Sequence, residues 1–421
     1  MDYVNVLSQI LKKSDKLINS PEFKEAYTAD NTFIRDRKLS FENSIYFILS
    51  GLRKSLSIEI SQFSENYKEL LFKEVSKQAF SKARQNISHE AFAELCRLFV
   101  NIFYESDLEL KKWNGFNVFA IDGTSLQVPD TQENVEYFGC RKNQYDTQTA
   151  LASASAMYDV LNDVVLDAII DTYPAKEKNQ ARRHIEAITN PKILDNSIIT
   201  FDRGYPSFEF FNYLGQKNIF YVFRLSEAFG FAKSQSTSDS IHEYKKGNIN
   251  GKARVIKFNL PDGTKETLIT NIFDFGITVP MFKELYFLRW GIECKYKELK
   301  SGIEIEEFSG KKPITIKQDF YTSLYLSMLS SMIKNQTDMA IALTVSNATK
   351  YQYQSNRNFI LNKVFNKLIH MLIHHRKANK IINSIIEKAK KIRSHIRPNR
   401  SCERKNKHPR KKHHYQIKSC L

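Results

Sequence analysis

The sequence predicts an α/β protein in which a mixed β-sheet is preceded and followed by helical regions. In residues 1–112 the apolar side chains recur every three or four positions, which is the spacing of amphipathic helices. Residues 113–225 instead hold short runs of β-branched and aromatic residues that alternate with helical segments. Helical spacing returns near residue 281 and continues to about 390. With 42% hydrophobic residues, the 421-residue chain has ample material for a packed core.

The N-terminal region, residues 1–112, is predicted to be entirely helical. Ser40 and Ser88 each precede an amphipathic stretch and are candidate helix caps. Residues 76–88 predict a further helix, followed by a turn and the next helix, an order found in helix-turn-helix proteins. The cations available there to a DNA backbone are Lys77, Lys82 and Arg84. We interpret this region as a DNA-binding domain; the alternative is a set of ordinary helices with a basic outer face.

The central region predicts a sheet with a characteristic element order. Strands are expected at 116–122, 150–160, 161–171, 197–204 and 219–225, and helices at 175–189 and 206–218. The order βββαβαβ, a three-strand meander followed by alternating helices and parallel strands, is that of a ribonuclease-H-like core. We expect this core to comprise residues 113–225 and 281–330.

Three further segments surround that core. Residues 226–280 are rich in polar turns between short strand-like runs, which predicts a β-rich insertion. Residues 331–390 are predicted to be a helical C-terminal region. Residues 391–421 form a basic tail with eleven Lys or Arg against one acid, Glu403, so 10 of the 17 net positive charges of the chain lie in it. Such a tail is expected to stay flexible and bind phosphates without sequence preference, unless it is simply solvated.

Cysteine usage and hydropathy exclude other classes of protein. The five cysteines form no C-x-x-C pair, which argues against a disulfide framework and against a thiolate zinc site. The N-terminus lacks the basic and apolar segments of a signal peptide, and no apolar run approaches the length of a membrane span. The sequence therefore predicts a cytoplasmic protein with no membrane partner.

Two aspartates follow predicted buried strands. Asp122 comes directly after the run FNVFAI, and Asp202 comes after SIITF. If the two strands are neighbours, their carboxylates meet. Taken singly, each has an ordinary explanation, because Asp often ends a strand and Asp122–Gly123 resembles the start of a turn.

The helix predicted at 281–301 carries a narrow polar stripe. At about 100° per residue, its polar members fall within about 60° of one another: Tyr286, Arg289, Glu293 and Lys300. An apolar face lies beside this stripe. A simple i,i+4 ion pair between Arg289 and Glu293 is the alternative explanation.

Three carboxylates without His or Cys predict an oxygen-only site for Mg²⁺ or Mn²⁺. Two such ions about 4 Å apart can activate a nucleophile on one side of a phosphorus and stabilise the leaving oxygen on the other. Guanidinium, ammonium and phenol groups next to the carboxylates match the non-bridging oxygens of a phosphodiester. The predicted reaction is phosphoryl transfer on DNA.

Three motifs carry a family resemblance: AIDGTSLQVPDT, TFDRGYPS, and the pattern Y-x2-R-x3-E-x6-K followed by FSG. Together they resemble the acidic motifs of bacterial insertion-sequence transposases of the DDE type, specifically the insertion-sequence-four-like group with its Y-R-E-K signature. The resemblance covers roughly residues 30–330. It implies that Asp122, Asp202 and Glu293 form the catalytic and metal-binding triad.

The resemblance also implies DNA contacts and partners. It assigns Tyr286, Arg289 and Lys300 to the DNA end, and it implies two Mg²⁺ or Mn²⁺ ions as cofactors. The expected partners are the terminal inverted repeats, the target DNA and a second copy of the chain, which would form a homodimer on paired ends. The resemblance also implies that the protein is located at the bacterial nucleoid. Finally, it implies that cleavage passes through a hairpin intermediate. One departure is that residues 203–285 lack the Trp on which some members stack a flipped base, although aromatic residues are available there: Phe258, Phe273 and Phe275.

Two other functions remain open on the sequence. A ribonuclease-H-like DNA nuclease would need the same acids but would not transfer strands. A domesticated DNA-binding protein would need none of them, so the three intact acids argue against it.

Overall fold

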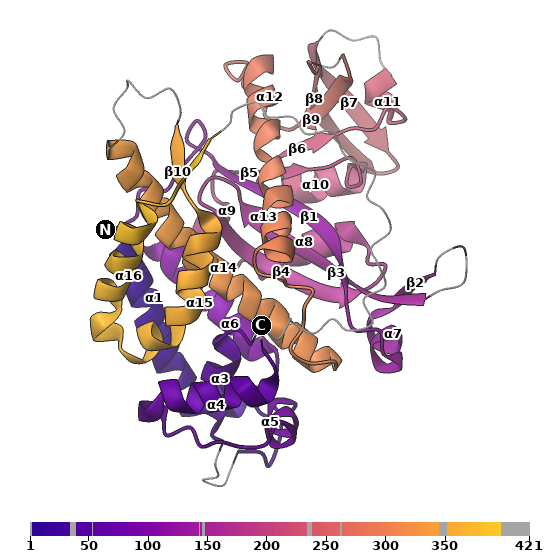
Figure 1. Cartoon of the computed structure of the whole chain (residues 1–421). Helices are drawn as coiled ribbons and strands as arrows, with labels where there is room; N and C mark the ends of the chain where they lie inside the picture. Colours follow the sequence, from indigo (N-terminus) through magenta and orange to yellow (C-terminus); the bar gives the residue numbers. More distant parts are fainter. Residues whose placement is uncertain are drawn as a thin grey trace. The chain divides into compact units, whose positions relative to one another are not determined.

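The computed structural model describes residues 2–33, 39–52, 54–142, 144, 148–233, 238–261, 263–344 and 352–396. The chain divides into two compact units (Figure 1). The first unit contains Met1–Leu108, Leu126–Ala152 and Glu298–Leu421, and the second contains Glu109–Ser125 and Ser153–Lys297.

The first unit is mostly helical, as the apolar spacing predicts. Its elements are α1 (Tyr3–Ile18), α2 (Pro21–Tyr27), α3 (Phe41–Leu49), α4 (Leu56–Asn66), η1 (Lys68–Leu70), α5 (Lys77–Arg84), α6 (Glu90–Glu105), α7 (Gln132–Phe138), β2 (Cys140–Lys142), α14 (Pro313–Thr344), β10 (Tyr353–Ser355), α15 (Arg357–Ile373), α16 (His375–Ala389) and β11 (Arg393–His395). Ser40 caps α3 by accepting a hydrogen bond from the backbone N–H of Asn43. At α6 the cap position is His89, and Ser88 accepts from the N–H of Glu90.

Helix α14 is buried along most of its length in this unit, where it contacts α1, α3, α6, α15 and α16. Its sequence is not amphipathic, since serines and threonines are interspersed with apolar residues on every side. The buried hydroxyls of Ser330, Ser331 and Thr337 donate to the carbonyl four residues earlier. The helix therefore satisfies these polar groups internally and can be enclosed by its neighbours.

The second unit is built on a mixed sheet. Its elements are β1 (Asn117–Gln127), β3 (Gln148–Asp159), β4 (Val164–Thr172), α8 (Glu177–Ala187), α9 (Pro191–Leu194), β5 (Ser197–Phe201), α10 (Phe208–Gln216), β6 (Phe220–Arg224), α11 (Gly230–Lys233), β7 (Asp239–Lys246), β8 (Ile249–Asn259), β9 (Lys265–Thr270), α12 (Val279–Leu288) and α13 (Trp290–Ser301). The strand order is β3–β1–β5–β6–β9–β8–β7, with β4 paired to β3. Strands β1, β5 and β6 are parallel, and the pairs from β6 to β7 are antiparallel. The first residues of β3 and the last of β1 belong to the first unit, where β2 pairs with β3.

Helices cover both faces of the parallel strands. Side chains alternate between the two faces along a strand. In β5, Ile198 packs in one apolar cluster with Phe282 of α12. Phe201, three positions later and hence on the other face, contacts Phe210 of α10. Every residue of β5 is accordingly buried.

The predicted element order is confirmed in the second unit. Strands β1, β3 and β4 are followed by α8, β5, α10 and β6, with the short α9 added before β5. The predicted β-rich insertion contains β7, β8 and β9, and these strands extend the main sheet through the β6–β9 pair.

Three local predictions are wrong. The strand predicted to end at Asp122 continues to Gln127 as β1, so the alternative of a turn at Asp122–Gly123 does not hold either. The helix predicted at 281–301 is two helices, α12 and α13, with Arg289 between them. The start of the predicted flexible tail is ordered, since Arg393–His395 pairs with β10. Residues 397–421 of that tail lie outside the described residues.

Within the part of the chain that the structure describes, none of the helices combines the length and the apolar character of a bilayer-crossing helix.

Candidate active site

The two predicted aspartates lie level with each other on neighbouring parallel strands. The β1–β5 register pairs Asn117 with Ser197 and Ala120 with Thr200, a constant offset of 80 residues. Continued by two places, this register sets Asp122 opposite Asp202. Both are an even number of positions from the residues that face α12, so alternation directs them to that face. The predicted meeting of the two acids is thus supported by strand pairing.

Glu293 reaches the same place from the α12–α13 junction. Arg289 follows α12 in helical geometry and precedes α13, which places Glu293 one turn further along. The Nη2 atom of Arg289 lies 2.6 Å from Glu293 Oε1, and its Nη1 atom lies 3.7 Å from Asp122 Oδ2. The guanidinium is only 3% exposed. One buried cation therefore bridges two of the three predicted acids.

Burial and charge crowding both act on the pKa of Asp122. The pKa of this carboxyl is raised from 3.8 to about 6, mainly by burial; the Gly123 N–H and Arg289 oppose the rise, and the neighbouring carboxylates Glu293 and Asp202 add to it. Burial alone would lower the pKa of Arg289, but Tyr286, Glu293 and Asp202 raise it above its ordinary value. A site that holds three acids around one cation retains net negative charge and favours a bound dication.

In the absence of divalent ions, we expect the contribution of Asp122 to stability to fall as pH rises from about 4 to about 6. Over that window the unfolded chain has released the Asp122 proton while the folded chain still holds it, so the free energy of unfolding falls with pH until the folded pKa is passed. The Asp122→Asn variant lacks this titration. Urea denaturation of both proteins in chelator, at several pH values, measures the difference; an offset that is independent of pH would contradict the expectation.

Backbone contacts fix the strand at Asp122. Its carbonyl accepts hydrogen bonds from the Tyr296 hydroxyl at 2.7 Å and from the Ser155 hydroxyl at 3.1 Å. Ser155 Oγ lies 2.9 Å from Nε2 of the fully buried His184, whose Nδ1 lies 2.5 Å from Asp167 Oδ2. Side chains from β3, β4, α8 and α13 thereby position one residue of β1. This network was not predictable from the sequence, because its members are scattered over 174 positions.

A fourth carboxylate, that of Glu177, lies beside Gly123 and Gly204, which closely follow the two aspartates in the chain. A Cβ added at Gly204 would lie 3.0 Å from Glu177 Oε2, and one added at Gly123 would lie 3.7 Å from Oε1. Nearby, Tyr205 is 1% exposed, and its hydroxyl has no hydrogen-bond partner among the described residues. Burial raises the pKa of Tyr205 well above its usual range, and the charges of Asp122 and Glu177 raise it further. Sequence analysis placed Glu177 only within a helix and missed its position.

The donor set fits divalent cations that prefer oxygen. All the acids at this place are carboxylates, and Oδ1 of Asp202 is buried without a hydrogen-bond partner in the described part of the chain.

Of the other predicted site residues, Tyr286 lies in the second unit and Lys300 lies in the first. Tyr286 is 7% exposed, and its hydroxyl donates to the carbonyl of Phe201 at 3.4 Å. Lys300 lies on α13 but in the first unit, where its Nζ is 3.5 Å from Glu306 Oε1. The structure thus brings Tyr286 to the acids through Arg289, whose guanidinium carbon is 5.7 Å from the centre of the Tyr286 ring.

Among the aromatic candidates, Phe273 and Phe275 are exposed by 42% and 57%, whereas Phe258 packs against the apolar cluster of the sheet. Sequence analysis overlooked Trp290, which is 42% exposed and lies next to Arg289. Its place inside the Y-R-E-K pattern, three residues before Glu293, was the available signal.

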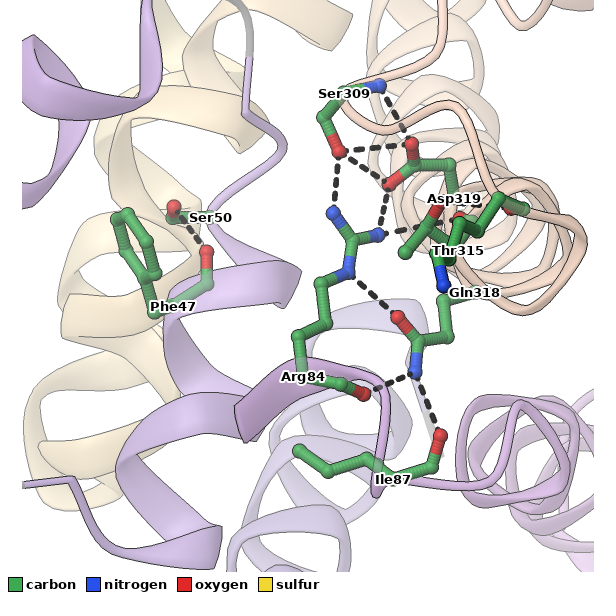
Figure 2. Close-up of polar contacts among 9 residues, drawn as sticks. Phe47, Ser50, Arg84, Ile87, Ser309, Thr315, Gln318 and Asp319 are labelled. Carbon is green, nitrogen blue, oxygen red and sulfur yellow. Dashed lines mark hydrogen bonds and ion pairs between the residues drawn. The ribbon is translucent and has the colours of Figure 1, made fainter. Parts of the chain in front are cut away.

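Arg84 does not project from the N-terminal helices toward solvent, contrary to the prediction (Figure 2). Its guanidinium is 3% exposed and lies 2.7 Å from Asp319 Oδ1. It also donates to Ser309 Oγ and Gln318 Oε1 (Figure 2). Lys77 and Lys82 are exposed, as predicted.

The central region of the chain matches a known protein family. The profile of the family described as "Transposase DDE domain" matches residues 113–329, which is 217 of the 421 residues. All six predicted site residues, from Asp122 to Lys300, lie within this range.

Two individual proteins are also similar. A protein of Escherichia coli K12 named "Putative transposase InsZ" is 31% identical over 107 residues, which are 25% of this chain and 34% of that protein. The match thus spans about a third of that relative. A piggyBac transposase, solved by cryo-EM as a synaptic complex with hairpin DNA, aligns over 92% of this chain and 85% of its own, with 9% identity and a TM-score of 0.43. That score is too low to establish a shared fold.

Proposed function

Because the chain belongs to the transposase DDE domain family, we propose that it is a DNA transposase of the insertion-sequence-four-like group with the Y-R-E-K signature. It would bind the terminal inverted repeats of its element, cleave the ends and transfer the 3′-hydroxyl strands to target DNA. The observation that carries this proposal is the approach of Asp122, Asp202 and Glu293 to one edge of the sheet around Arg289. A ribonuclease-H-like core is part of the proposal, supported by the element order and by parallel β1, β5 and β6.

Asp122, Asp202 and Glu293 are the proposed ligands of two Mg²⁺ or Mn²⁺ ions. When bound, such ions supply Lewis-acid activation of the nucleophile and stabilisation of the leaving oxygen. The chain itself orients the acids: Tyr296 and Ser155 hold the Asp122 carbonyl, and Arg289 holds Glu293.

Arg289, Tyr286 and Lys300 are the proposed contacts to the DNA end. Support comes from Arg289, whose Nε and Nη1 atoms are buried and make no hydrogen bond to any described residue. A guanidinium that has N–H donors without hydrogen-bond acceptors beside the acids can pair with a non-bridging phosphate oxygen. If Glu293 bound a metal ion in place of Arg289, the Nη2 atom of Arg289 would also be free to donate to a phosphate oxygen.

The DNA partners, the homodimer on paired ends and the bacterial nucleoid location are parts of the same proposal. The exposed Lys77 and Lys82 of α5 and the basic segment 397–421 are its candidate non-specific phosphate contacts. Cleavage through a hairpin intermediate is also proposed, because the family resemblance implies it.

The experiment that tests the function uses the DNA that flanks the gene. The full-length protein is incubated with Mg²⁺, a duplex carrying one flanking repeat and a supercoiled target. Joined products support the transposase. Cut products without joining favour the ribonuclease-H-like nuclease, and a mobility shift alone favours a domesticated DNA-binding protein.

Glu177 is proposed to assist the metal-binding acids, because its carboxylate lies beside Gly123 and Gly204, close to both aspartates in the chain. We expect Glu177→Gln to reduce Mg²⁺-dependent cleavage by about 10- to 100-fold, the usual loss when a residue that supports metal ligands is changed. Raising the Mg²⁺ concentration should recover part of the activity. The matched control is Glu186→Gln, an exposed glutamate at the other end of α8. Equal activity of the two variants would contradict the assignment.

A further inference from the structure

Two histidines and a glutamate form a compact group of metal-ligating side chains in the first unit. His370 lies in the last turn of α15 and His374 caps it, with the His374 N–H bonded to the His370 carbonyl. Residues four apart on a helix share one side. A ring nitrogen from each histidine and a carboxylate oxygen of Glu69, in η1, all lie within 4.8 Å of one another. Over the described residues, this trio alone meets that limit.

The distances approach those around a tetrahedral metal ion. His374 Nε2 lies 3.1 Å from Glu69 Oε1. Two ligands bonded to Zn²⁺ at about 2.0–2.1 Å in a tetrahedron are about 3.3 Å apart, so this pair already has the required separation. The His370 nitrogen needs to move inward by at most about 1.5 Å to match it. Its ring packs on Tyr67, with 4.8 Å between the ring centres, which restricts the imidazole without enclosing it.

The charge states also suit a metal. Hydrogen bonding to its own backbone N–H lowers the pKa of Glu69 despite partial burial, and His374 lowers it further. Burial lowers the pKa of His370, and the positive charge of Lys367 acts in the same direction. At neutral pH the group therefore offers an ionised carboxylate and a neutral imidazole, which are the forms that bind metals.

We propose that Glu69, His370 and His374 bind one zinc ion, with water in the fourth position. Two imidazoles and one carboxylate are a donor set typical of Zn²⁺, whereas Mg²⁺ prefers oxygen alone. This site lies in the first unit and is distinct from the carboxylates of the second unit, so the inference does not rest on the proposed function. Because Glu69 and His374 are 305 positions apart, the ion would cross-link the N-terminal and C-terminal parts of the first unit.

The competing explanation is a simple hydrogen-bonded pair of His374 and Glu69 at a helix C-terminus, where a partly positive imidazole is favoured. In that case all three residues contribute to stability, but zinc adds nothing. Metal binding, rather than stability alone, therefore distinguishes the two.

The test is a Zn²⁺ titration of the full-length protein against a chromophoric chelator, with Mg²⁺ in excess to occupy oxygen-only sites. We expect one Zn²⁺ per chain whose affinity falls at least about tenfold in His370→Ala and in His374→Ala, since even residues that only support ligands cost about 10- to 100-fold. The matched control is His375→Ala, the adjacent partly exposed imidazole, which should bind zinc as the parent does. The tail residues His408, His413 and His414 are present in every variant and contribute equally.

Two further measurements cover a variant that folds poorly. Zn²⁺ at about 100 times its dissociation constant should raise the melting temperature of the parent by about 3 °C, and that of Glu69→Gln much less. Co²⁺ added to the parent should give the strong visible absorption of a nitrogen-ligated ion of low coordination number. Zinc binding that is equal in the parent and both histidine variants, or only the weak spectrum of hydrated Co²⁺, would overturn the proposal.

Discussion

Asp122→Asn, Asp202→Asn and Glu293→Gln are each expected to lower Mg²⁺-dependent cleavage of an end duplex at least about 10³-fold. Each change removes the charge of a proposed metal ligand and almost no volume, so folding and end binding should be nearly unchanged. The reason is geometric: the β1–β5 register and the α12–α13 junction bring these three acids together, and oxygen ligands are what Mg²⁺ requires. Single-turnover cleavage and a mobility-shift assay on the same duplex measure the two properties separately.

Asp195→Asn is the matched control for this series. Asp195 is exposed and lies just before β5, at the opposite end of the strand from Asp202. It should cleave at the rate of the unchanged protein. Near-normal cleavage by any one of the three triad variants would refute its role as a ligand.

Arg84→Met is expected to lower the free energy of unfolding by about 3–5 kcal/mol, the usual effect of removing one partner from a buried ion pair. The substitution leaves the Asp319 carboxylate, 11% exposed, without its cation. It also removes the donors that Arg84 directs at Gln318 Oε1 and Ser309 Oγ (Figure 2). Urea denaturation followed by circular dichroism measures the change.

Two comparisons make this prediction specific. Lys82→Ala, an exposed cation of the same helix, should stay within about 0.5 kcal/mol of the unchanged protein. Adding Asp319→Asn to Arg84→Met should restore part of the loss, because the amide oxygen can still accept from the Ser309 N–H while no charge remains buried. If Arg84→Met behaves like Lys82→Ala, Arg84 does not stabilise the unit as the structure indicates.

The spacing of hydrophobic residues predicted helices and strands well where an element is buried on one side or along its whole length. The β5 run SIITF is buried at every position, and its neighbours β6 and α10 were found within two residues of their predicted bounds. The predicted end of an element was wrong where a strand continues past a charged residue. Asp122 interrupts an apolar run, yet β1 continues to Gln127, because Ser155 and Tyr296 support the backbone from other elements.

The site was predictable in the part that depends on strand order and helix spacing. Asp122 and Asp202 required only adjacent parallel strands, and Arg289 with Glu293 required only a helical turn. Glu177 and the His184 network required tertiary contacts that no local pattern encodes. The prediction that Arg84 is available to DNA was wrong for a related reason. The position of a basic residue in a short helix is the same in the sequence whether its side chain faces solvent or Asp319.

The constant offset of 80 residues between β1 and β5 also limits which changes in chain length this protein can tolerate. Deleting or inserting one residue between Asn117 and Ala120 would turn Asp122 to the opposite face of the sheet, because side chains alternate along a strand. Removing two residues would keep the face but shift the carboxylate by about 7 Å along the strand. The turn between β7 and β8, at Gly247 with its φ of +58°, has no such link to the acids. Natural variation in length should therefore accumulate in the β7–β8 turn and be absent from the first half of β1.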